Sequence, residues 1–384
     1  MKICSNATLT PEINSKIRVS KWLTQQGVNM SLSHQQKVYI PKEARTNQYI
    51  TAEIKVTDEL LAQYPDYHSC YQTLSRIIFN LAEQHDLRNV HVITNDKLPV
   101  VRYHTEAYCF QTAEQILFFY NPAYHEAQNL FTADNYRARK LRIVFLATGD
   151  EIRSNSANFH TRVRELLNEL MPKLPINDLK VKIRDHQHLS YDLFAKSKGN
   201  KETYGYKLRA IAPRYKARKC DLPENVSSLT YVTVSLPLSR KLKQGLLPES
   251  ATDFSPLYQH LEDNFIKAAT NKQLTRLAMI ANGLTPLVRN SKFEKLDSKA
   301  EVQMIGFDPN ATEQQVIRRW DADNLVEAAH FTIVAGAKDC DDSGYGRFMN
   351  NVEAALKTFA AEIGLDPERE DLVVRFHQHI SYQL

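Results

Sequence analysis

Two stretches of the chain carry the same motif and decide its fold. Residues 181–193 read Val-Lys-Ile-Arg-Asp-His-Gln-His-Leu-Ser-Tyr-Asp-Leu, and residues 372–384 read Leu-Val-Val-Arg-Phe-His-Gln-His-Ile-Ser-Tyr-Gln-Leu. Side chains alternate across a β-strand, so a strand of this sequence has a mostly apolar face and a polar face. The polar faces carry, in order, Arg184, His186, His188 and Ser190 in the first copy and Arg375, His377, His379 and Ser381 in the second. Each motif therefore predicts a strand that packs a core on one side and presents these four side chains on the other.

The similarity continues outside the motif and predicts a tandem duplication. Residues 93–128 align without a gap on residues 280–315, with ten identities in 36 positions. Tyr49-Ile-Thr51 likewise matches Tyr231-Val-Thr233. Alternating strands, two amphipathic helices and a turn ending in Pro-x-Val-Arg recur in both copies. We expect an α+β (or α/β) fold built from a unit of roughly 150–190 residues, with about five strands and two to three helices per unit.

The length of 384 residues favours two domains over a single core. We expect an N-terminal arm at 1–45, the first repeat unit at 46–194, a basic linker at 195–225 and the second unit at 226–384, with the units related by a pseudo-twofold axis.

Composition indicates a soluble, cytoplasmic protein. Hydrophobic residues make up 43% of the chain and charged residues 24%, which are ordinary globular values. The sequence has no apolar run of about 18 residues and no secretory signal, so we expect no membrane partner. The five cysteines include no C-x-x-C pair, which predicts free thiols.

The paired histidines predict a transition-metal site. Two histidines separated by one residue on a strand lie on the same face, about 7 Å apart at Cα, which is close enough to chelate one ion. We therefore expect Fe, Zn, Cu or Mn at His186, His188, His377 and His379, either as two sites or as one shared site. A further ligand would come from Glu114 and Glu301, Glu126 and Glu313, or His125. The leading hypothesis is a metal-dependent oxidoreductase or hydrolase acting on a small polar or anionic substrate.

Acid–base catalysis without a metal is a second interpretation of the same strands. Arg184 and Arg375 offer a planar fork to an anion, imidazoles transfer protons near neutral pH, and Ser190 and Ser381 complete the hydrogen bonding. Arg102 and Arg289, at the ends of the Pro-x-Val-Arg turns, could each add a cation. His-Leu-Ser-Tyr and His-Ile-Ser-Tyr resemble, over four residues in each half, the signature of the two-histidine phosphoesterases. That resemblance implies a phosphoesterase that uses one such motif from each of two pseudosymmetric lobes. Alternatively, the histidines serve only to hydrogen-bond neighbouring strands.

A basic segment suggests nucleic acid as an alternative partner. Residues 196–219 contain nine Lys or Arg and a single acidic residue, interleaved with tyrosines. Such a composition can track a phosphate backbone and stack bases. The residues that would carry this RNA- or DNA-binding role are Lys207, Arg209, Arg214, Lys216, Arg218 and Lys219.

Overall fold

The computed structural model describes most of both predicted units. The described residues are 45–103, 108–111, 114–121, 127–131, 136–149, 151, 156–174, 181–192, 227–239, 242–243, 246–291, 296–298, 302–308, 310–336, 344–365 and 372–383. The whole of the predicted basic linker, 195–225, and the predicted N-terminal arm except its last residue, Arg45, therefore lie outside the described residues.

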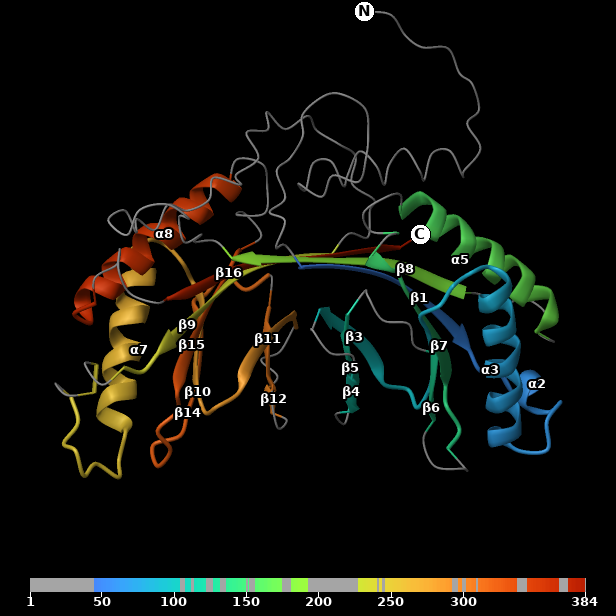
Figure 1. Ribbon diagram of the computed structural model, residues 1–384, viewed down its shortest axis with the longest axis horizontal. Helices are drawn as coiled ribbons and strands as arrows, with labels where there is room; N and C mark the ends of the chain where they lie inside the picture. Colours follow the sequence, from blue (N-terminus) through green and yellow to red (C-terminus); the bar gives the residue numbers. More distant parts are fainter. Residues whose placement is uncertain are drawn as a thin grey trace, which may run out of the picture.

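One large sheet spans both halves of the chain (Figure 1). Its ten described strands follow the order β14 (Gln315–Trp320), β10 (Arg276–Ala281), β15 (Ala328–Val334), β9 (Ser227–Pro237), β16 (Val373–Gln383), β8 (Val181–Asp192), β1 (Arg45–Lys55), β7 (Lys140–Leu146), β2 (Val90–Thr94) and β6 (Ala127–Phe131). The outermost pairs, β10 with β14 and β2 with β6, are parallel, and the strands between them pair antiparallel. The two motif strands, β8 and β16, are adjacent at the centre.

The two halves contain matching elements in matching order. Outward from the centre, the first half contributes β8, β1, β7, β2 and β6, and the second contributes β16, β9, β15, β10 and β14. Each half adds a three-stranded sheet: β3 (Leu98–Tyr103), β5 (Gln115–Tyr120) and β4 (Tyr108–Gln111) in one, and β11 (Thr285–Asn290), β13 (Val302–Phe307) and β12 (Leu296–Ser298) in the other. The expectation of a mixed α and β fold is confirmed. The expected five strands per unit were too few, because each half has eight described strands.

The missing strands include the Pro-x-Val-Arg segments, which the sequence suggested were turns. Pro99 and Pro286 stand second in β3 and β11, edge strands of their small sheets, where the lack of an N–H is tolerated.

Helices cover the convex face of the arched sheet, and the small sheets lie beneath its concave face (Figure 1). The helices of the first half are α2 (Asp58–Leu61), α3 (Tyr67–Gln84) and α5 (Ser156–Leu170), followed by a 3-10 turn, η1 (Met171–Lys173). Those of the second half are α7 (Ser255–Thr270) and α8 (Gly344–Glu362). Buried residues recur along α3 at positions 71, 74, 78 and 81, the spacing of one helix face. None of the described helices is long and apolar enough to span a membrane.

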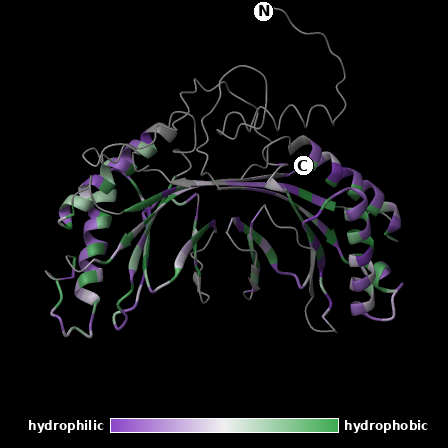
Figure 2. Ribbon diagram, in the orientation of Figure 1, coloured by the Kyte–Doolittle hydropathy of each residue, from purple (hydrophilic) through white to green (hydrophobic). Residues whose placement is uncertain are grey.

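Buried apolar residues form clusters on both sides of the sheet. Figure 2 shows hydrophobic residues recurring along the strands and helices. Ile50, Ala52 and Ile54 of β1 pack toward α3 and α5, and Val374 and Phe376 of β16 join the corresponding core of the second half. On the concave side, apolar residues of the small sheets pack against the large one. The small sheets also contact each other through Leu117, Leu287, Val302 and Met304. The polar face of β8 and β16 is therefore enclosed between the large sheet and the two small ones.

Candidate functional site

The register of β8 with β16 brings the two motifs together about a common centre. His188 lies opposite His379, His186 opposite Ser381, and Ser190 opposite His377. Arg184 donates a hydrogen bond from Nε to Ser381 Oγ at 3.1 Å. Because the pairing is symmetric about the facing His188 and His379, each half's His and Ser side chains meet those of the other half. This proximity is a consequence of strand pairing that neither motif reveals alone.

A tyrosine and a threonine from the neighbouring strand hold the outer histidine of each motif. The Tyr49 ring stacks on His186 with centroids 4.4 Å apart, and Thr51 Oγ1 shares a hydrogen bond with His186 Nε2 at 3.0 Å. In the second half, Tyr231 stacks on His377 at 4.4 Å, and Thr233 Oγ1 lies 2.9 Å from His377 Nε2. Sequence reasoning assigned these residues no role. The feature of the sequence that could have identified them is the Tyr-x-Thr segment, which occurs in both copies.

His188 is buried and His379 is half-buried, and some nitrogen atoms of the motif histidines lack hydrogen-bond partners among the described residues. His188 is 4% exposed, and neither Nδ1 nor Nε2 has a hydrogen-bond partner there. His379 Nε2 and His186 Nδ1 also have no hydrogen-bond partner among the described residues. Burial lowers the pKa of His188 and His379 well below the usual value and that of His186 to about 3. These imidazoles are therefore neutral at pH 7 and can donate, accept or ligate.

Arg102 supplies a cation directly beneath the histidines. It extends from β3, donating from Nη1 to its neighbour's carbonyl, Val101 O, at 2.9 Å and from Nη2 across to Val288 O of β11 at 3.3 Å. Burial raises the pKa of Tyr231, and the nearby Arg102 guanidinium opposes that rise. After burial, its charge is the next cause of the low pKa of His188. Arg289, its counterpart on β11, has a buried Nε with no partner among the described residues.

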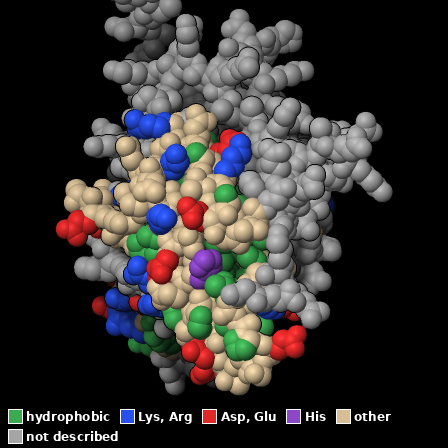
Figure 3. Space-filling view, turned by 90° about the vertical axis from the view of Figure 1, so that its left-hand side faces the viewer, with side chains coloured by type: hydrophobic (Ala, Val, Ile, Leu, Met, Phe, Trp, Pro, Cys, Tyr) green, Lys and Arg blue, Asp and Glu red, His purple; other side chains and the backbone are tan. Residues whose placement is uncertain are grey.

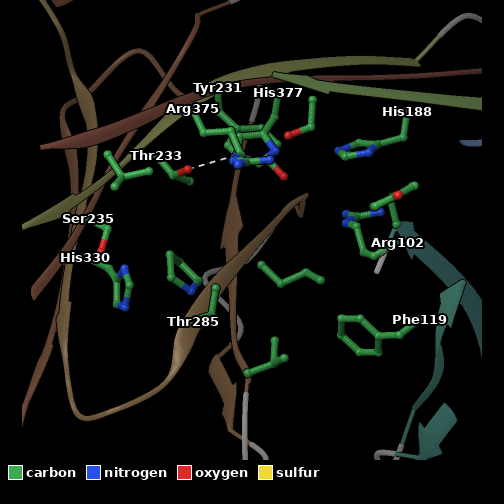
Figure 4. Close-up of a pocket in the computed structure, with 16 residues that line it drawn as sticks. Arg102, Phe119, His188, Tyr231, Thr233, Ser235, Thr285, His330, Arg375 and His377 are labelled. Atoms are coloured by element: carbon green, nitrogen blue, oxygen red, sulfur yellow. Dashed lines mark hydrogen bonds between the residues drawn. The ribbon is translucent and has the colours of Figure 1, made fainter. Parts of the chain in front are cut away.

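A cavity of about 370 Å³ opens beside these groups on the side of the second half (Figure 4). This volume lies in the range of small-molecule sites. Its lining residues are Arg102, Tyr103, Phe119, His188, Ser190, Tyr231, Thr233, Ser235, Thr285, Pro286, Leu287, Val302, His330, Val373, Arg375 and His377. This set contains two arginines, three histidines and four hydroxyl side chains of Ser or Thr but no Asp or Glu. A cavity with this lining favours an anion.

Of the eight predicted site residues, the cavity gathers His188, Ser190, Arg375 and His377. The other four, Arg184, His186, His379 and Ser381, lie on the same face of the motif strands toward or within the first half. The ring centroids of His188 and His377 are 5.8 Å apart, and those of His186 and His379 are 5.9 Å apart. The centre thus offers two equivalent diagonal pairs, one toward each half.

The described part of the chain contains pairs of imidazoles, as the metal prediction requires, but no complete set of metal ligands. No group of three or more His, Cys, Asp or Glu side chains suited to a metal ion occurs there. Among the carboxylates suggested as further ligands, Glu114 and Glu313 are described outside any such group, whereas Glu126, Glu301 and His125 fall outside the described residues.

The nucleic-acid prediction rests on residues that the structure does not describe. Lys207, Arg209, Arg214, Lys216, Arg218 and Lys219 all lie between 193 and 226, outside the described ranges. On the end of the molecule seen in Figure 3, the described Lys and Arg side chains are interspersed with Asp and Glu. That face adds no support to the prediction.

Comparison with known protein families assigns the chain to one of them. A search of curated proteins finds no match to the chain. A family model matches residues 69–382, a range that includes β8, both small sheets and all of β16 except its last residue. The chain thus belongs to the family described as protein of unknown function (DUF3083).

Proposed function

We propose that the chain is an enzyme that acts by acid–base catalysis on a small anionic substrate, with phosphate esters as the favoured class. The observation that carries the proposal is that His188 and His377, one from each motif, line the same cationic cavity with ring centroids 5.8 Å apart. Arg102 and Arg375 would hold the anion, and Ser190 would add a hydrogen bond. The resemblance of each motif to the two-histidine phosphoesterase signature favours the same chemistry.

In this mechanism one imidazole accepts a proton from the attacking water or hydroxyl, and the other donates a proton to the leaving oxygen. The low pKa of buried His188 would disfavour proton uptake in the free protein. A bound anion opposes both burial and the charge of Arg102, so it raises this pKa toward the working range. Substrate binding itself would therefore prepare the proton transfer.

The test uses the full-length protein and two probes. Inorganic phosphate binding is measured by calorimetry, and hydrolysis of bis(4-nitrophenyl) phosphate is followed by absorbance. We expect His188→Ala and His377→Ala to lower hydrolysis at least 100-fold, whereas His68→Ala, on helix α3, leaves it unchanged. Hydrolysis and phosphate binding that survive in both cavity variants would refute the proposal.

Metal binding by the same histidines is a second proposal, favoured by the partnerless nitrogen atoms of His188 and His379. An imidazole nitrogen that has no hydrogen-bond partner can bind a transition metal. Elemental analysis of the same preparations for Fe, Zn, Cu and Mn tests it. Near-stoichiometric metal that falls in His188→Ala supports a metal-dependent enzyme, and its absence after reconstitution contradicts one.

We also propose that the matching halves arose by duplication and are related by a pseudo-twofold axis, as their common element order and the symmetric pairing of β8 with β16 suggest. Cys70 and Cys109 form no disulfide bond in the described part of the chain, which is compatible with a cytoplasmic location.

A further inference from the structure

Three rows of side chains cross the concave face on each side of the centre, and two of the rows are alike in both halves. The row nearest the centre is His186–Tyr49–Leu146 in the first half and His377–Tyr231–Val334 in the second. The next is Arg184–Thr51–Val144 and Arg375–Thr233–Thr332. Both halves therefore keep the groups that surround the diagonal histidine pairs.

The third row, which we call the outer row, differs completely. In the first half it is Lys182–Glu53–Arg142, and in the second it is Val373–Ser235–His330. The same three places in the sheet thus hold charged side chains in one half and small or neutral ones in the other. A shift in strand register does not cause this difference, because the two inner rows have the same strand pairing in both halves.

In the first half, the outer row forms a structural ion pair. Arg142 Nε donates to Glu53 Oε2 at 3.1 Å, and Arg142 Nη1 donates to Lys97 O at 3.2 Å, linking the large sheet to the segment before β3. Lys140 adds a second cation to Glu53. Although burial alone would raise the pKa of Glu53, hydrogen bonds and charge from Lys140 and Arg142 hold it below its usual value. The Arg142 side chain is only 8% exposed, so long charged side chains fill this end of the concave face.

In the second half, the outer row lines the cavity instead. Ser235 and His330 stand directly opposite each other at the end of the cavity away from His188 and Arg102 (Figure 4). Ser235 is far shorter than Glu53, and Ala328 replaces Lys140 in the sheet, so neither the acid nor its cations occupy this space. Burial lowers the pKa of His330, which leaves a neutral ring there. Phe119, Leu287 and Val302 contribute apolar side chains to the same lining.

We infer that, of the two equivalent places in the described part of the sheet, only the one on the side of the second half is a ligand site, and that this site takes an anion bearing an aromatic or apolar body. The anionic group lies against Arg102, His188 and His377, and the body extends past Thr285 toward Ser235 and His330 (Figure 4). The Glu53–Arg142 pair closes the equivalent place in the first half. This inference rests on the proposed function, because it assumes that the cavity is the substrate site.

The experiment exchanges the outer rows and measures two probes by calorimetry on the full chain. Phenyl phosphate, used as its non-hydrolysable analogue phenylphosphonate, has an anionic group and an aromatic body, whereas inorganic phosphate has the anionic group alone. We expect the wild type to bind one phenyl phosphate per chain. Ser235→Glu with His330→Arg should weaken phenyl phosphate at least 10-fold and inorganic phosphate less than 3-fold. Ser235→Phe, which fills the cavity without a buried charge, should do the same. Glu53→Ser with Arg142→His should create a second phenyl phosphate site.

The outcomes separate the two proposals. Two phenyl phosphate sites in the wild type, or unchanged affinity in both Ser235 variants, would overturn the single-site inference and leave the proposed function standing. Retained inorganic phosphate binding in the Ser235 variants shows that they are folded. If inorganic phosphate does not bind the wild type, or binds His188→Ala equally well, the proposed function fails and this inference fails with it.

Discussion

At the scale of single residues, the large sheet is unusual because it buries neutral imidazoles. His188 is 4% exposed and His91, on β2, is 3% exposed. Burial lowers the pKa of His188 well below its usual value and that of His91 to about 4. In the unfolded chain both would titrate near the ordinary value of about 6.5. Each residue therefore links protonation to folding.

The sign of this linkage predicts acid sensitivity. Because the folded-state pKa is depressed, the stabilising effect is fully present above about pH 6.5 and is lost as the pH falls toward the folded-state pKa. We expect His188→Gln to flatten the dependence of unfolding free energy on pH by about 1 kcal/mol per pH unit between pH 6 and 5. Urea denaturation at pH 7, 6 and 5 measures this. His91→Gln should behave alike, and variant curves parallel to the wild type would contradict the linkage.

The threonines that contact the outer histidines provide a matched pair of substitutions. Thr233 lines the cavity and Thr51 holds the same position in the other half. We expect Thr233→Val, which removes the hydrogen bond to His377, to weaken phenyl phosphate about 10-fold, the cost of roughly one hydrogen bond to a ligand-binding group. Thr51→Val should leave the affinity unchanged. Equal effects of the two substitutions, measured by calorimetry, would show that the halves bind alike.

At the scale of elements, a buried carboxylate joins helix α7 to the edge strand β14. Glu262 is 3% exposed, accepts a hydrogen bond from Trp320 Nε1 at 3.0 Å and pairs with Arg318. These contacts hold in place a strand that, among the described strands, pairs with β10 alone. The exposed Arg319 also makes this edge a poor template for another chain.

Removing this carboxylate should loosen the edge strand. We expect Glu262→Ala to lower the unfolding free energy by about 2 kcal/mol, because it leaves the Trp320 indole N–H without its acceptor. Glu262→Gln keeps an acceptor and should cost less. Urea denaturation followed by circular dichroism compares them, and an equal loss in the two variants would exclude the hydrogen bond as the cause.

At the scale of the whole molecule, the halves are joined twice. β8 pairs with β16 along nine residue positions, and the small sheets meet through Leu117, Leu287, Val302 and Met304. Unfolding one half would expose both the central strand edge and this apolar contact. The two halves should therefore unfold together, although the sequence suggested separate domains.

Cooperative unfolding can be measured with a single tryptophan. The chain has two, Trp22 and Trp320, so Trp22→Phe leaves a reporter in the second half alone. We expect its fluorescence and far-ultraviolet circular dichroism, which reports both halves, to give coincident urea transitions. Leu117→Ala, in a fully buried contact, should shift both transitions together, at a cost of about 2–5 kcal/mol. Separate transitions would mean that the halves are independent.

The sequence by itself determined the local features of this protein. Alternation along residues 181–193 and 372–384 correctly separated the face that packs the core from the face that carries histidines, because side-chain parity is a property of any strand. Helical spacing identified α3 and α7 for the same reason. The equivalent positions of Arg102 and Arg289 in the two copies also identified Arg102, whose charge acts on His188.

Only the tertiary structure decided which of these groups meet. The pairing of His188 with His379, the diagonal approach of His377 to His188, and the contrast between Glu53–Arg142 and Ser235–His330 all depend on the register between strands that are far apart in the chain. That register is set by the packing of whole faces against helices and small sheets, and no local pattern encodes it. The sequence thus specified the chemical groups, and the fold placed four of the predicted eight in one cavity.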